Sequence, residues 1–332
     1  MNVKHIVSAF VLAVLLLASC GVSDYHHVKV GRAEPVHVTR FDSLVYNYVN
    51  EPDSLQRQAL EEQAGDFWTI YNLHLMRFLG APYFYESLTR YMEISNVKKL
   101  YDDTQRMYSD MSDIEASLAQ MLARYKKLFP DGKDYIFQSH ISGLKIPVLA
   151  VDSLISVSLD CYLGADYELY ETRYKVYEMP LHSCECLLPD VGEVMVRNMI
   201  PAPKGNLLEV MVYEGIVAHV LAGVLDDATV TTVLRYTPEQ EAWCMQYEEE
   251  IWNKIVEQCH LFTHDRMTIN KYIYPGPFTA TLTQDSPARV GRWVGWRIVQ
   301  RYMEEEHVSI EELVNDRTPY MDMFQKSYYN AR

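Results

Sequence analysis

The sequence lacks the short motifs by which many enzymes are recognised. It contains no G-x-S-x-G nucleophile elbow, no phosphate-binding loop, no glycine fingerprint of a dinucleotide-binding domain and no internal repeat. Positive charge is also scarce, because 30 Lys and Arg face 45 Asp and Glu and give a formal net charge of −15. An acidic surface repels nucleic acid and anionic lipid headgroups, so we expect neither as a partner.

Cysteines are few and irregularly spaced, which argues against a disulfide framework. Five remain beyond Cys20, and an odd number cannot all pair internally. Metal-ligand residue types occur together in His182-Ser183-Cys184-Glu185-Cys186, but Cys-x-Cys is not the usual spacing of a zinc site. We therefore expect no bound metal and no cofactor.

One predominantly apolar run stands near the N-terminus, and no second stretch resembles a membrane span. The run covers residues 6–18, follows Lys4 and is shorter than the roughly 20 residues that a spanning helix needs. At its end, Leu17-Ala18-Ser19-Cys20 forms a lipobox, the cleavage site of bacterial lipoprotein signal peptides. We predict that residues 1–19 are removed as a signal peptide and that Cys20 receives acyl chains such as palmitate, which anchor the exported protein to a membrane.

The remainder predicts a tether and one mixed domain. Residues 20–35 show no periodic apolar pattern and are expected to form the tether. Residues 36–332 are expected to form a single α+β domain, mostly helical, with a mainly helical part at 36–130 and a small mixed sheet plus helices at 131–332. The expected strands are 36–42, 135–137, 147–152 and 155–160, and the main expected helices are 67–79, 83–94, 110–129, 190–200, 205–225, 238–261 and 286–306.

Capping boxes are predicted at three helix starts. In this motif an N-cap hydroxyl and a side chain three residues later each bond the other's backbone N–H. The predicted pairs are Ser112 with Glu115, Thr237 with Gln240, and Ser309 with Glu312.

The apolar helix expected over 205–225 contains the run Tyr213-Glu214-Gly215-Ile216-Val217. In a zinc peptidase of the His-Glu-x-x-His type, two histidines on one helix face bind zinc and the glutamate activates the bound water. Here Tyr213 and Val217 stand at the histidine positions, and His219 lies about 240° around the helix from Tyr213, so no zinc site is expected. Glu214 is either a weak candidate for a catalytic acid or base, or a buried carboxylate paired with an arginine.

Arginines gather near the C-terminus of this acidic chain, on the helix expected from Ser286 onward. They are Arg289, Arg292, Arg297 and Arg301, and Trp293 and Trp296 stand among them. Gly291 and Gly295 share one face, which permits close approach of a neighbouring backbone. The arginines form either a structural ion-pair network or an anion site, and the candidate binding residues are Arg289, Arg292, Trp293 and Trp296.

Several segments together resemble the gliding motility-associated lipoprotein GldB family of Bacteroidetes. They are spread over most of the chain beyond the signal: TRFD at 39–42, LDCYLGADY at 159–167, YEG at 213–215, RYTPEQEAWC at 235–244 and SPARVGRWVGWRIV at 286–299. The family is also distantly similar to zincin-type peptidases. That similarity implies a zincin-like scaffold, with 155–167 as the edge strand and its loop and 205–225 as a degenerate active-site helix.

The resemblance implies a cell-envelope lipoprotein that serves surface motility in gliding relatives, alongside a secretion system. We interpret the chain as non-catalytic and as binding an envelope, motility or secretion protein. One alternative is a hydrolase acting on envelope peptides or polymers with Glu214 as acid or base. Another is a glycan-binding lipoprotein, suggested by 25 tyrosines and by the tryptophans. Residues 21–25 lack the acidic run associated with surface export in this phylum, so we expect an outer-membrane anchor and a body facing the periplasm.

Overall fold

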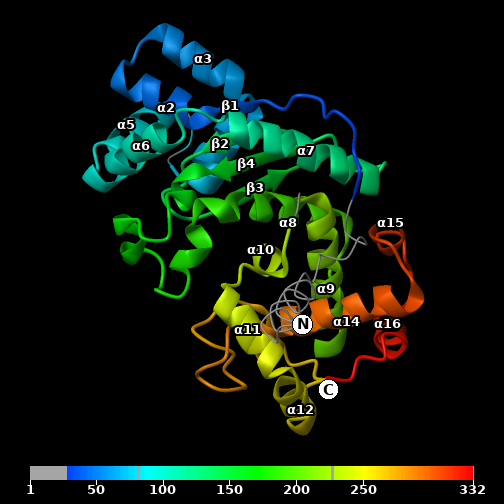
Figure 1. The fold of residues 1–332 in the computed structure, drawn as a ribbon. Helices are drawn as coiled ribbons and strands as arrows, with labels where there is room; N and C mark the ends of the chain where they lie inside the picture. The colour runs from blue at the N-terminus through cyan, green and yellow to red at the C-terminus, as the bar shows by residue number, and fades with distance from the viewer. Residues whose placement is uncertain (1–27, 79, 81–82, 226–227, 332) are drawn as a thin grey trace, which may run out of the picture.

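The computed structural model describes residues 28–78, 80, 83–225 and 228–331, in which helices surround a small sheet (Figure 1). The lipobox and Cys20 lie outside these residues, so the signal peptide and the lipidation stay predictions. The expected α+β class, mostly helical with a small mixed sheet, is confirmed.

The sheet has four strands in the order β1-β2-β4-β3. β1 (Val38–Arg40), β2 (Ile136–His140) and β4 (Leu154–Ser158) run parallel, and β3 (Val148–Val151) is antiparallel to β4. A tight turn at Asp152 and Ser153 joins β3 to β4 as a hairpin and leaves β3 outermost. The expectation that 155–167 forms the edge strand was therefore wrong, because β4 is enclosed between β2 and β3.

Six α-helices and a π-helix are described between β1 and β2. All but the last of them share an apolar cluster, in which Phe41 packs edge-on against Phe67 and Tyr71 at ring-centroid distances of 5.1 and 4.8 Å. The helix expected over 67–79 is divided between a short α-helix and the π-helix. The elements are α2 (Phe41–Asn50), α3 (Ser54–Ala64), α4 (Asp66–Ile70), η2 (Tyr71–Leu75), α5 (Phe84–Met92), α6 (Ser95–Met107) and α7 (Ser112–Leu128).

The start of α7 differs from its prediction. Ser112 is the first helical residue, not the N-cap, and its backbone N–H donates to Asp110. The Glu115 carboxylate accepts a hydrogen bond of 2.8 Å from the backbone N–H of Val38 instead of closing a capping box. The predicted capping box is thus replaced by a link from α7 to strand β1.

The other half of the body is built on three helices, α8 (Leu187–Met199), α9 (Leu207–Val224) and α14 (Val290–Glu306). α9 is the central helix, and α8 and α14 both pack on it. We predicted that no second stretch of the sequence resembles a membrane span, but α9 is long and apolar enough to cross a membrane. In the structure, 94% of this helix is buried inside the protein. The helix that packs against β3 and β4 is α8. The zincin-like scaffold implied for 155–167 and 205–225 is not confirmed by this arrangement.

α9 and α14 approach closely at two glycines, as predicted for the second of them. A Cβ added to Gly215 would overlap the carbonyl of Gly295, and a Cβ on Gly295 would overlap the carbonyl of Met211. The contact fixes the position of α14, and with it the arginines at its start, relative to α9.

The remaining helices complete the C-terminal half. The capping boxes at Thr237 and Ser309 are confirmed, and a further one at Asn206 begins α9. The helix expected over 238–261 is two helices, and the one expected from Ser286 begins only after Arg289. The elements are η3 (Leu159–Tyr162), η4 (Glu168–Thr172), η5 (Met179–His182), η6 (Cys184–Cys186), α10 (Val230–Leu234), α11 (Pro238–Gln246), α12 (Glu248–Glu257), α13 (Arg266–Ile273), α15 (Ile310–Leu313) and α16 (Tyr320–Lys326).

The described end of the expected tether lies on the body. Val28 is 2% exposed in the main core, and the carbonyl of Lys29 accepts a hydrogen bond of 3.2 Å from Lys127 on α7. Lys127 also pairs with Glu311 on α15. The chain is therefore held against α7 and α15 from Val28 onward.

Candidate functional site

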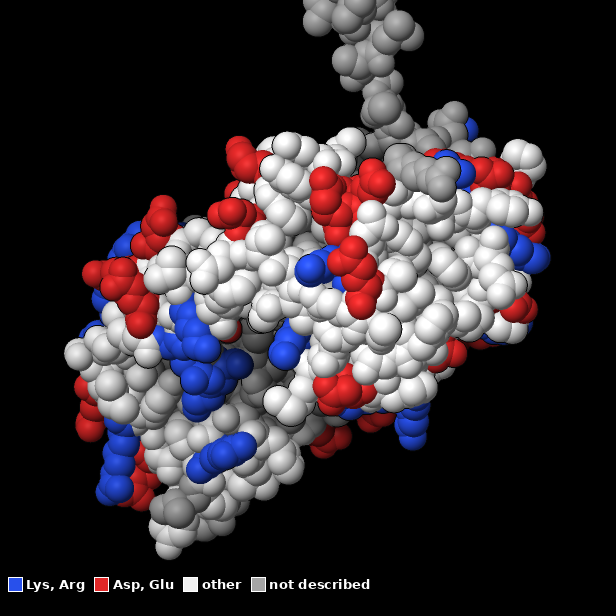
Figure 2. All heavy atoms as spheres, turned by 90° about the horizontal axis from the view of Figure 1, so that it is seen from below, with Lys and Arg blue, Asp and Glu red and all other residues white. Residues whose placement is uncertain are grey.

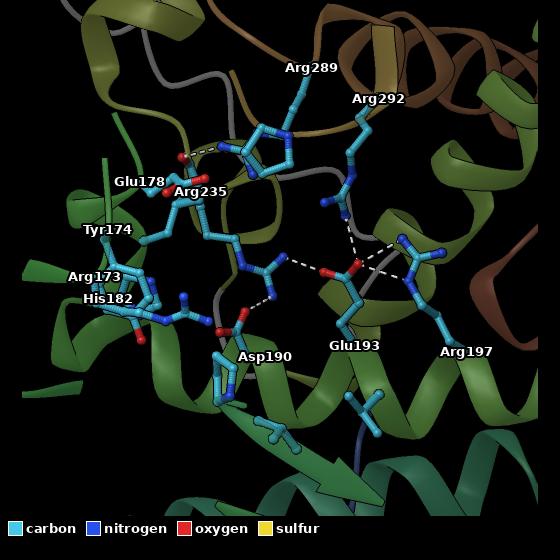
Figure 3. A pocket seen from close by; sticks show the side chains of 15 residues that line it. Arg173, Tyr174, Glu178, His182, Asp190, Glu193, Arg197, Arg235, Arg289 and Arg292 are labelled. Atoms are coloured by element: carbon cyan, nitrogen blue, oxygen red, sulfur yellow. Dashed lines mark hydrogen bonds and ion pairs between the residues drawn. The ribbon is translucent and has the colours of Figure 1, made fainter. Parts of the chain in front are cut away.

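A cleft of about 660 Å³ lies between α8, the edge strand β3 and the loops that precede α8 and α14. Arg289 and Arg292 enter it from the side of α14, facing Asp190, Glu193 and Arg197 on α8 (Figure 3). Lys and Arg side chains gather beside a hollow on the face seen from below, although the protein as a whole is acidic (Figure 2). The lining is Pro147, Val148, Arg173, Tyr174, Glu178, Leu181, His182, Asp190, Glu193, Val194, Arg197, Arg235, Pro275, Arg289 and Arg292.

Glu193 is the centre of the charged network. One of its oxygens accepts hydrogen bonds from Arg197 at 2.7 Å and from Arg292 at 3.1 Å, and the other accepts from Arg235 at 2.5 Å. Burial alone would raise the pKa of Glu193, but the charges of Arg292, Arg235 and Arg197 outweigh it and hold the pKa well below its usual range. Glu193 is therefore ionised at neutral pH and is fully engaged by arginines.

Arg235 reaches the network from the C-terminal end of α10. It adopts the left-handed conformation with φ of 50°, which ends the helix and turns its side chain toward α8. There it donates to Asp190 at 2.6 Å as well as to Glu193. Burial opposes the charge on Arg235, but Glu193 and Asp190 outweigh burial and raise its pKa. The guanidinium thus acts as a bridge between two carboxylates of α8.

Arg289 has no carboxylate partner among the described residues. It is 7% exposed, it donates one hydrogen bond of 3.0 Å to the carbonyl of Arg235, and its guanidinium lies 5.6 Å from the centre of the Tyr236 ring. Burial, together with repulsion from Arg292, lowers the pKa of Arg289 to about 10. The group therefore remains charged at neutral pH, and its remaining N–H donors have no acceptor in the described part of the chain.

Glu214 lies behind this cleft. Its side chain is 7% exposed, and its two oxygens accept from Arg197 at 3.0 and 2.6 Å, while Arg292 Nε lies 3.1 Å from one of them. The sequence left two predictions for Glu214, a catalytic acid or base and a buried carboxylate paired with an arginine, and the geometry matches the second. Both oxygens of Glu214 are thus engaged by the guanidinium of Arg197.

The two positions that would hold zinc ligands are occupied by packing residues. Tyr213 donates from its hydroxyl to the carbonyl of Ile200, and Val217 is fully buried. The His219 ring stacks on the Trp296 ring with their centroids 3.7 Å apart, and His219 Nε2 forms a hydrogen bond with the Trp296 carbonyl. Among the residues that the structure describes, no group of three or more His, Cys, Asp and Glu is arranged to hold a metal ion.

The other sequence-predicted residues separate into two groups. Arg289 and Arg292 line the cleft, whereas Trp293 and Trp296 are 1% and 6% exposed and pack in the core. Sequence reasoning missed the acidic side of the site and three of its arginines, Arg173, Arg197 and Arg235. The signal available was the spacing of Asp190, Glu193 and Arg197, which share one face of α8 at three- and four-residue intervals.

The segment His182 to Cys186 borders the cleft through its histidine alone. His182 Nδ1 donates a hydrogen bond of 3.0 Å to the carbonyl of Cys161, and the His182 ring stacks on the Tyr174 ring with their centroids 3.6 Å apart. Burial lowers the pKa of His182, so the ring is neutral at pH 7. Cys184 is exposed and Cys186 is buried, and both are free thiols.

These features define an acidic, mostly helical α+β protein with a cleft built from arginine–carboxylate pairs. Comparison with known families then gives a specific assignment. A family model described as "Gliding motility protein GldB" matches residues 24–331, and the chain belongs to this family of motility-associated lipoproteins. No curated protein and no solved structure matches the chain, so the similarity to zincin peptidases is not supported by a structural relative.

Proposed function

We propose that this protein is a non-catalytic lipoprotein of the cell envelope that binds a partner protein of the motility or secretion machinery. In this proposal residues 1–19 are removed and lipidated Cys20 anchors the body to the outer membrane on its periplasmic side. The lipobox and the family support the anchor. The cleft between α8, β3 and α14 is the binding surface.

One observation carries the non-catalytic part of the proposal. Glu214, the carboxylate on the helix that most resembles a peptidase helix, is tied to Arg197 by two hydrogen bonds. The alternative of a hydrolase requires Glu214 to face a water or substrate, and nothing in the geometry favours that. The alternative of glycan binding, suggested by the tyrosine and tryptophan content, is weakened because Trp293 and Trp296 are buried.

The test is photocrosslinking from the rim of the cleft in intact cells. Lys175 is exposed and directly follows Tyr174 in the cleft wall, so a photoreactive amino acid at position 175 of the full chain would face a bound partner. Lys254 on α12 is half exposed and lies outside the cleft, which makes position 254 the matched control.

We expect a small set of protein adducts at position 175 that are absent at position 254. We also expect these adducts to be lost when Cys20→Ala removes the anchor, because tethering raises the effective concentration at the membrane. Equal adducts at both positions, or none at position 175, would contradict the proposal. Retention of zinc through dialysis, abolished by Glu214→Gln, would favour the hydrolase instead.

A further inference from the structure

We infer that the cleft binds a carboxylate group of the partner, with Arg289 as the residue that receives it. This inference rests on the proposed role in partner binding and specifies its chemistry. The observation behind it is that Arg289 is a buried cation without a carboxylate partner among the described residues, at the wall of an open cleft.

A buried charge without a counter-charge destabilises a folded protein, because the lost hydration is not replaced. The three neighbouring arginines avoid this cost through Asp190, Glu193 and Glu214. Arg289 replaces only part of its hydration, through one backbone carbonyl and the face of Tyr236. A carboxylate from a ligand would supply the counter-charge that Arg289 lacks.

The count of charges favours a ligand with one negative charge. Counting Glu214, which lies behind the lining, four arginines face three carboxylates around the centre of the cleft, which leaves an excess of one positive charge. The arginines are Arg197, Arg235, Arg289 and Arg292, and the carboxylates are Asp190, Glu193 and Glu214. Arg173 and Glu178 also line the cleft, and their opposite charges leave this excess unchanged. A carboxylate neutralises it, whereas a phosphate dianion would over-compensate and be repelled by Asp190 and Glu193.

The rest of the lining fits a peptide that presents such a group. A volume of about 660 Å³ is within the range of ligand sites, and Pro147, Val148 and Leu181 supply apolar walls. His182 donates from Nδ1 to a carbonyl, so the neutral ring leaves Nε2 as an acceptor without a partner among the described residues. That nitrogen can accept from a peptide N–H. The source of the carboxylate is either a chain terminus or an acidic side chain.

The inference is tested by titrating the full-length lipidated protein, held in neutral detergent, with three fluorescently labelled peptides. They are acyl-Ala-Ala-Ala with a free carboxyl terminus, the same peptide as its amide, and acyl-Ala-Glu-Ala amide, each measured by fluorescence anisotropy in chloride buffer. We expect the amide of the first peptide to be the weakest ligand. Tightest binding of the free carboxyl terminus identifies a terminal source, and tightest binding of the Glu peptide identifies a side-chain source.

The variant Arg289→Gln is expected to bind the preferred peptide about tenfold more weakly or worse, because it removes a charge-assisted hydrogen bond. Arg106→Gln removes an arginine that is 75% exposed on α6 and is expected to bind normally. Without peptide, Arg289→Gln is expected to unfold at the same temperature as the unchanged protein or higher, since it deletes an unpaired buried charge. A purely structural arginine would lower that temperature.

Equal binding of all three peptides, displacement by inorganic phosphate but not by acetate, or unchanged binding in Arg289→Gln would overturn the inference. If Arg289→Gln fails to fold, the peptide and anion series on the unchanged protein decides the matter. Partner adducts at position 175 that persist without any carboxylate preference would contradict this inference while leaving the proposed function intact.

Discussion

Arg197 and Glu214 join α8 to α9 through a bidentate ion pair, with Nη1 3.0 Å from Oε1 and Nη2 2.6 Å from Oε2. The same guanidinium also bonds Glu193, so one side chain links the binding cleft to the core of the protein. The pair keeps Glu214, the glutamate at the position of the peptidase base, buried and bonded to arginine.

Glu214→Gln tests the structural role of this pair. The substitution leaves Arg197 and Arg292 short of one buried counter-charge, and we expect a loss of about 3 kcal/mol in the free energy of unfolding. Urea unfolding followed by tryptophan fluorescence measures it. Glu250→Gln, on the exposed face of α12, is the control and is expected to change stability by less than about 0.5 kcal/mol. A neutral effect at position 214 would contradict the structural role given to this ion pair.

The pH dependence of stability tests Glu193. Its pKa in the folded protein lies well below the usual value, because Arg292, Arg235 and Arg197 outweigh burial. A lowered pKa contributes stability that is fully present above the unfolded value of about 4.3 and is lost as the pH falls toward the folded value. Glu193→Gln should therefore be less stable than the unchanged protein at pH 7. The gap should shrink once the pH drops below about 4.3, which unfolding at a series of pH values measures. A gap independent of pH would contradict the role given to Glu193.

The glycine contact between α9 and α14 gives a third prediction. Gly295→Ala places a methyl group against the Met211 carbonyl and must force the helices apart. We expect a loss of about 3 kcal/mol or more, at the upper end of overpacking effects, because the obstacle is backbone. Gly31→Ala is the control, since no atom lies within 4 Å of its added Cβ. Thermal unfolding of both variants checks the prediction, and equal stabilities would show that the helices can separate without cost.

Local patterns predicted much of the fold because their causes are local. The apolar run expected over 205–225 forms α9 at Leu207–Val224, since burial on all sides requires such a run. The capping box at Thr237 formed because both partners lie within one turn. At Ser112 no capping box formed, because the Glu115 carboxylate accepts a hydrogen bond from the backbone of Val38 instead. Val38 lies 77 residues away in the sequence, so no local pattern could predict this contact.

Of the cleft residues, the sequence predicted only Arg289 and Arg292, because the other charged residues are distant from them in the sequence. Arg289 and Arg292 stood out because they are cationic residues close together in an acidic chain. Their counter-charges come from α8, and Arg235 comes from the end of α10, so only tertiary packing brings them together. The delayed start of α14 depends on a contact outside the helix, because Thr279, eight residues earlier, donates a hydrogen bond to the Pro287 carbonyl.

The anchor can be tested without reference to the fold. Cys20→Ala removes the thiol that would be lipidated, and we expect the protein to move from the detergent phase to the aqueous phase in a phase-separation assay, since acyl chains dominate its membrane affinity. Cys259→Ala changes an exposed free thiol and is expected to leave the protein in the detergent phase. Retention of the Cys20 variant in the detergent phase would contradict the lipoprotein assignment of this position.

The most direct measurement of the central claim, partner binding through the arginine-lined cleft, is the yield of the crosslinked partner from position 175 in living cells. The yield is compared between the otherwise unchanged chain, Arg289→Gln and the control Arg106→Gln, at equal protein levels. We predict a fall of about tenfold in Arg289→Gln and no change in the control. An undiminished yield in Arg289→Gln would contradict the claim that Arg289 holds the partner in this cleft.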